Sequence, residues 1–146
     1  METRGGFLIS QIKQIQGRIF EKLLSKSGID AFNGAQGRIL YVLWQKDELP
    51  IVELSRQTGL AKTTLTGMLD RLETQGLITR CADANDRRQI IIRLTDSAKQ
   101  LSSDYQRVSA DMNAIFYRGF SHDEIALFEQ TLNRILDNLN ESETIK

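Results

Sequence analysis

The fold is decided by residues 51–94, which read IVELSRQTGLAKTTLTGMLDRLETQGLITRCADANDRRQIIIRL. A short helix is predicted over residues 51–57, because Pro50 just before them has no amide to leave unpaired in a first helical turn. The residues Thr58-Gly59-Leu60 should end this helix, since glycine supplies the positive φ that a tight turn between helices often needs. The stretch therefore begins as a helix followed by a sharp turn.

A second amphipathic helix is predicted over residues 61–75, ending at Gly76. Its apolar residues fall at positions i, i+3, i+4 and i+7, and they are Leu65, Met68, Leu69 and Leu72. Two strand-like runs follow at residues 77–81 and 89–94, joined by the polar tip 82–88. Helix, turn, helix and hairpin together indicate a winged helix-turn-helix, in which the second helix enters the DNA major groove and the hairpin reaches the backbone or the minor groove.

The remaining segments are predicted to be helical. We expect helices over residues 7–24, from Asn33 to about Asp47, and from the N-cap Thr95 through Phe116 as one long element. Ser121 and Glu124 form a capping box that opens the last helix. The predicted fold class is thus mainly α with a small β-hairpin wing, organised as a lobe over residues 33–98 and a helical dimerisation region over 7–27 and 99–140.

The terminal helices carry more apolar surface than one small lobe can cover. In the last helix the apolar residues are spaced 3, 4, 3 and 4 apart, which is typical of a seam that packs along another helix. We therefore predict a homodimer interface that contains Ile12, Ile15, Ile19, Phe128, Leu132 and Ile135.

Composition excludes several classes of function. The 146 residues carry 19 basic and 19 acidic side chains, so net charge alone does not indicate nucleic acid, although residues 55–93 hold seven basic against four acidic. One cysteine and one histidine cannot supply a disulfide or the usual zinc cage. With no phosphate-binding glycine loop or nucleophile elbow, we expect no enzyme, no metal and no cofactor.

The absence of a signal peptide or a bilayer-length apolar run predicts a cytoplasmic protein.

Over nearly its whole length the chain resembles the multiple antibiotic resistance regulator (MarR) family of bacterial transcription factors. The most specific portions are residues 60–80, LAKTTLTGMLDRLETQGLITR, and the wing residues 83–88, DANDRR, with Leu94-Thr95 after them. The resemblance implies a ligand-responsive repressor that binds a pseudo-palindromic operator on double-stranded DNA as a homodimer. It also implies a small-molecule pocket between the dimerisation helices and the DNA-binding lobe.

The candidate DNA-binding residues follow from this alignment with the family. In the recognition helix they are Lys62, Thr63, Thr64, Thr66 and Gly67, with Arg71 as a weaker phosphate candidate that could instead pair with Asp70 or Glu73. In the wing they are Arg87 and Arg88, one of which we expect Asp83 or Asp86 to hold while the other projects.

Several alternatives stay open at this point. Each threonine could serve as a cap or face solvent, and the same winged face could bind protein instead of DNA. Cys81 could be a peroxide sensor or, as we favour, an ordinary thiol, and His122 is expected to be a solvated first-turn residue. Some aromatic side chains could line a pocket or belong to the core, namely Phe20, Trp44, Tyr105 and Tyr117.

Overall fold

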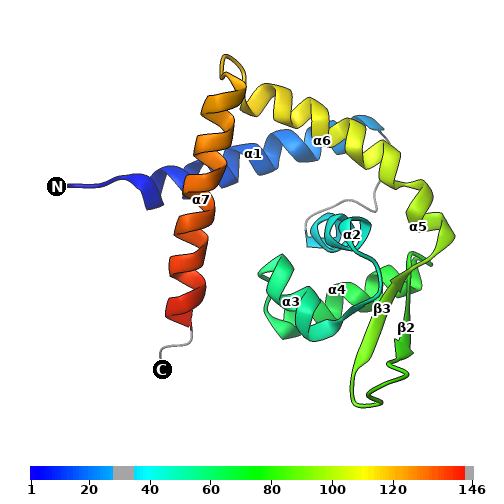
Figure 1. Ribbon diagram of the computed structural model, residues 1–146. Helices are drawn as coiled ribbons and strands as arrows, with labels where there is room; N and C mark the ends of the chain where they lie inside the picture. Colours follow the sequence, from blue (N-terminus) through cyan, green and yellow to red (C-terminus); the bar gives the residue numbers. More distant parts are fainter. Residues whose placement is uncertain (28–34, 144–146) are drawn as a thin grey trace. The chain divides into compact units, whose positions relative to one another are not determined.

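The computed structural model describes residues 1–27 and 35–143 (Figure 1). The chain forms two compact units, residues 1–112 and 113–146. The first unit contains the lobe and its flanking helices. The predicted start of the second helix at Asn33 lies outside the described residues. Among these residues, no helix is long and apolar enough to cross a membrane.

The first four helices match the sequence periodicity closely. They are α1 (Gly5–Ser27), α2 (Ala35–Gln45), α3 (Ile51–Thr58) and α4 (Lys62–Thr74). Gly59 and Gly76 have φ values of 71° and 75°, so the turn after α3 and the end of α4 both use the left-handed region that glycine tolerates. The helix-turn-helix is confirmed.

The core of this unit lies where α2, α3 and α4 meet the sheet (Figure 1). Every predicted inward position of α4 contributes, because Leu65, Leu69 and Leu72 are fully buried and Met68 packs beside them. The other fully buried large side chains come from neighbouring elements and are Leu24, Ile39, Leu40, Leu43, Leu54, Ile78 and Ile92. This packing fixes the outward face of α4.

The sheet has three strands where the sequence predicted two. The hairpin of β2 (Ile78–Ala82) and β3 (Ile90–Leu94) is joined by β1 (Leu49–Pro50), in the antiparallel order β1-β3-β2. Pro50 is therefore not in the first turn of α3: it is the N-cap residue, with extended backbone, and pairs with Ile91. A two-residue strand has too little periodicity to be visible in sequence, and proline is tolerated at such an edge.

The long fifth helix predicted after Thr95 is wrong, because it is divided into α5 (Asp96–Gln100) and α6 (Ser102–Phe116). Thr95 does cap α5, since its hydroxyl accepts the amide of Ala98. The Ala98 carbonyl in turn accepts the Trp44 indole N–H at 3.0 Å and the Leu101 amide at 3.2 Å. A side chain that enters the hydrogen-bond ladder is a known cause of a helix break, and here it comes from α2.

The second unit is built on α7 (His122–Glu143). Its predicted capping box is confirmed: Glu124 accepts the Ser121 amide at 3.0 Å, and the Ser121 hydroxyl accepts the Glu124 amide at 3.1 Å. No described residue of α7 is buried. This helix therefore presents its apolar seam without a cover from its own unit.

Candidate nucleic-acid interface

The N-terminal half of α4 presents a continuous polar surface. Its five candidate residues, Lys62, Thr63, Thr64, Thr66 and Gly67, are all exposed. The N-cap residue Ala61 makes no side-chain cap, so the first-turn amides of α4 have no side-chain acceptor. Amides at a helix N-terminus beside a lysine favour an anion, and this end of the helix suits a phosphate group.

Thr66 has its hydroxyl proton already engaged. Its Oγ1 donates to the Lys62 carbonyl at 2.9 Å, one turn back along the helix. The outward surface of Thr66 therefore consists of its methyl group and of an oxygen that can only accept a hydrogen bond.

Arg71 does not pair with either acidic neighbour. Asp70 and Glu73 both face Arg80 from β2, with N···O distances of 2.8 and 3.7 Å. Side chains one or two positions apart on a helix do not face each other, which is why Arg71 turns elsewhere. In the part of the chain that the structure describes, Arg71 is exposed and makes no ion pair.

The sequence prediction missed Arg80. Its place in the strand could have drawn attention to it. Arg80 shares a strand face with Ile78, which is fully buried, and an apolar residue would be expected on that face.

The wing arginines differ from each other. Asp86 Oδ1 accepts both the backbone amide of Arg88 at 3.1 Å and its Nε at 3.2 Å, so Arg88 is the arginine that a carboxylate holds. Arg87 is exposed and forms no ion pair within the described residues. Asp83 holds neither arginine, since its carboxylate accepts the Asn85 amide and shapes the tip.

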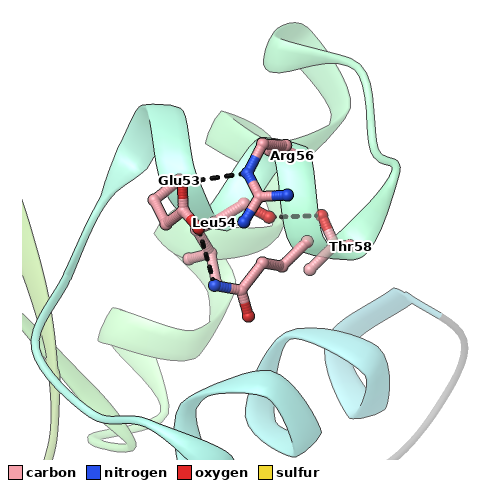
Figure 2. A network of polar contacts seen from close by, with 5 residues as sticks. Glu53, Leu54, Arg56 and Thr58 are labelled. Carbon is pink, nitrogen blue, oxygen red and sulfur yellow. Dashed lines mark hydrogen bonds and ion pairs between the residues drawn. The ribbon is translucent and has the colours of Figure 1, made fainter. Parts of the chain in front are cut away.

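The helix that precedes the turn is reinforced by its own side chains. Glu53 on α3 accepts hydrogen bonds from Arg56 and from Gln57, and Figure 2 shows the Arg56 guanidinium lying against the Glu53 carboxylate. These bonds, above all that from Arg56, lower the pKa of Glu53 to about 2. At the other end the buried Thr58 hydroxyl donates to the Leu54 carbonyl at 2.7 Å (Figure 2). These side-chain hydrogen bonds join successive turns of α3, the first helix of the helix-turn-helix.

Comparison with known proteins identifies the family of this chain. A model of the MarR family matches residues 32–90. The multiple antibiotic resistance protein MarR of Salmonella typhimurium is 31% identical over 132 residues, which cover 90% of each chain. The chain belongs to the MarR family.

Solved structures agree with this membership. A mutant MarR from E. coli, complexed with operator DNA, has a TM-score of 0.77 and 27% identity, covering 90% of this chain and 92% of that one. A MarR-family transcriptional regulator from Silicibacter pomeroyi has a TM-score of 0.77 and 25% identity, covering 92% and 88%. The predicted winged-helix fold is confirmed, and the predicted class of function, a DNA-binding transcriptional regulator, is supported.

The first unit of this MarR-family chain also contains a cavity of about 500 Å³ between α1, α2 and α6. Phe20 and Tyr105 line it and meet edge to face, with ring centroids 5.9 Å apart. Lys13 and Arg38 bring positive charge to it and Glu21 brings one negative charge. Arg38 also donates to the Thr58 carbonyl at 3.3 Å. Trp44 instead packs on the core, and Tyr117 belongs to the second unit, where its hydroxyl donates to Glu129 at 2.6 Å.

The predicted dimerisation residues are uncovered in their own units. In α1, Ile12 and Ile15 are each 43% exposed, and Ile19 is half-buried. In α7, Phe128 and Ile135 are exposed and Leu132 is half-buried. Both helices keep an apolar face available to a partner.

The remaining candidates show no specialised chemistry. Cys81 is half-buried at the end of β2, and its thiol lies 3.7 Å from the Ile91 carbonyl. Over residues 1–27 and 35–143, no group of three or more His, Cys, Asp or Glu side chains could hold a metal ion.

Proposed function

We propose that this chain is a homodimeric repressor that binds a pseudo-palindromic operator and is released from it by a small molecule. The observation that carries the proposal is the pairing, on one lobe, of an exposed polar recognition helix with a wing whose Arg87 has no carboxylate partner among the described residues. Such a protein would act in the cytoplasm, where bacterial DNA lies.

DNA contact is divided between two elements. Lys62 and the first-turn amides of α4 bind backbone phosphates, while Thr66 and Gly67 approach base edges in the major groove. Arg87 enters the minor groove beside the wing, and Arg88, held by Asp86, keeps the tip in shape and adds charge. A related mutant MarR from E. coli has been solved in complex with operator DNA, which supports DNA as the partner.

A dimer gives the two lobes a fixed separation. The apolar faces of α1 and α7 remain uncovered in their own units, and two copies would bury them against each other. Two-fold symmetric proteins recognise half-sites spaced by about one helical turn or a multiple of it, which is the reason to expect a pseudo-palindrome.

The α1–α2–α6 cavity is the proposed effector site. The two cations Lys13 and Arg38 outnumber the single carboxylate of Glu21 in the cavity lining. Together with the rings of Phe20 and Tyr105, this charge balance suits an aromatic molecule that carries a negative charge. Arg38 also contacts the carboxyl end of α3, so a ligand that engages its guanidinium would disturb the turn that joins α3 to α4. Binding in the cavity would thereby alter DNA affinity.

The test begins with selection of a preferred duplex from a random pool, followed by affinity measurements over a range of salt concentrations. The double variant Arg87→Ala/Arg88→Ala should bind every duplex more weakly and flatten the slope of log K against log salt by about 0.9 for each phosphate that the wing no longer binds. Arg107→Ala, which removes an exposed arginine from α6, is the matched control and should keep the wild-type slope. Equal slopes in all three proteins would contradict the assignment of the wing.

A protein-binding winged module is the alternative. It predicts no salt-dependent binding to any duplex, and a wild type that behaves in this way would favour it. The relatives are transcriptional regulators, which supports DNA over both protein binding and catalysis.

A further inference from the structure

We propose that Arg80 assists DNA recognition without touching DNA: it neutralises part of the negative charge of two carboxylates on the DNA-facing side of α4. The inference rests on the proposed function, because it takes α4 to be the element that enters the major groove. Arg80 itself lies on β2 and is not one of the residues of α4 that are proposed to face the groove.

The two carboxylates lie on the same stripe as the groove-facing threonines. Residues three and four apart share a helix face, so Asp70 follows Thr66 by one turn and Glu73 follows Asp70. Asp70 is 62% exposed and Glu73 46%. Two negative charges therefore continue the surface that must approach phosphates, and like charges placed across an interface oppose binding.

Arg80 reaches both carboxylates from the neighbouring strand. Its Nη2 lies 2.8 Å from Asp70 Oδ1, and its Nη1 lies 3.7 Å from Glu73 Oε1. The Arg80 side chain is only 26% exposed, so this interaction is less screened than the ion pairs on the open surface. One guanidinium thus offsets charge on α4 and joins the second half of α4 to the first strand of the wing.

Folding stability alone does not account for an arginine at this position. Its neighbour on the same strand face, Ile78, is fully buried, and the Arg80 Nε is itself buried and has no hydrogen-bond partner among residues 1–27 and 35–143. An unpaired buried donor opposes folding, and an apolar side chain of similar length would avoid that loss.

Arg80→Met tests the proposal, because methionine keeps an unbranched apolar stem and removes the charge. We expect the variant to fold with wild-type thermal stability or higher and to bind both the selected and the random duplex roughly tenfold more weakly at low salt, where repulsion from uncovered carboxylates is strongest. The deficit should shrink as salt is raised.

The decisive control adds Asp70→Asn and Glu73→Gln to Arg80→Met. If Arg80 acts by neutralising these carboxylates, the triple variant should recover most of the affinity that Arg80→Met removes, although the link between α4 and β2 is still broken. A triple variant as weak as Arg80→Met would overturn charge neutralisation, and wild-type affinity in Arg80→Met would overturn any role for Arg80 in binding.

Two further measurements separate this inference from the proposed function. Arg80→Lys keeps the charge and should bind more tightly than Arg80→Met, which also tests the proposal if the methionine variant does not fold. Wild-type protein that binds no duplex would overturn the proposed function itself. If the wild-type protein binds DNA, and Arg87→Ala/Arg88→Ala weakens this binding but Arg80→Met does not, only the inference about Arg80 is overturned.

Discussion

At the scale of single residues, Thr66 is the side chain whose local geometry restricts what it can recognise. Its hydroxyl proton is used inside α4, on the Lys62 carbonyl, so its methyl group is its main outward feature. We predict that Thr66→Ala narrows the difference in binding free energy between the selected and the random duplex by about 1–3 kcal/mol. Paired affinity measurements at one salt concentration give this difference.

Two conservative replacements serve as controls for Thr66. Thr66→Val keeps the methyl group and should retain more of the specificity than Thr66→Ser, which keeps only the hydroxyl. An unchanged preference in Thr66→Ala would mean that another residue reads the bases, because phosphate contacts carry no sequence information.

At the scale of the secondary-structure element, α3 depends on an ionised carboxylate. The pKa of Glu53 is lowered from 4.5 to about 2, chiefly by the hydrogen bond from Arg56, so the carboxylate is favoured in the folded state. Its stabilising effect is complete above pH 4.5 and is lost as the pH falls from 4.5 towards 2. Glu53→Gln should therefore unfold at a lower temperature than wild type at pH 7, with the difference vanishing across that window.

The ion pair of Glu53 lies at the surface, because Arg56 is exposed and the Glu53 side chain is 34% exposed, and this predicts an effect of salt on the same two proteins. Salt screens exposed ion pairs, so the difference in melting temperature at pH 7 should shrink at high ionic strength. A difference that does not change with pH would mean that Glu53 acts through packing or helix propensity instead of charge.

The break between α5 and α6 is the second element-scale feature open to test. Trp44→Phe removes the donor to the Ala98 carbonyl but keeps an aromatic ring, and the Leu101 amide still satisfies that carbonyl. We predict a loss of about 0.5–1.5 kcal/mol in the free energy of unfolding, measured by chemical denaturation. A larger loss would indicate that the ring packing depends on the indole.

At the scale of the whole molecule, the proposed dimer rests on the seam of α7. Leu132→Glu would place a charge in a subunit interface and should weaken dimerisation by several kcal/mol. Operator affinity should fall with it, because only a dimer fixes the spacing of two half-sites. Sedimentation gives the mass, and Asn133→Glu, an exposed neighbour beside the seam, is the control expected to remain dimeric.

Two outcomes would contradict the dimeric mechanism. A monomeric Leu132→Glu that binds the full operator at wild-type strength would show that the two lobes act independently. A Leu132→Glu protein that remains a dimer would place the interface elsewhere.

Much of the fold was predictable because local periodicity and turn chemistry decide it. Four features follow from interactions within a few residues of the chain. They are the inward residues of α4, the glycine turns after α3 and α4, the cap at Thr95, and the Ser121–Glu124 capping box. The pattern of helix, turn, helix and hairpin likewise predicted the winged-helix class. These features need no partner from a distant part of the chain.

Only the tertiary structure decided which polar groups meet. The two-residue strand β1 exists because it pairs with β3, and the α5–α6 break because Trp44 reaches across from α2. The sequence left open which wing arginine is held, and the structure pairs Arg88 with Asp86. Arg80 was missed because its carboxylates lie on another element, ten and seven residues earlier in the chain. Period and caps are local properties, whereas these contacts depend on how the elements pack.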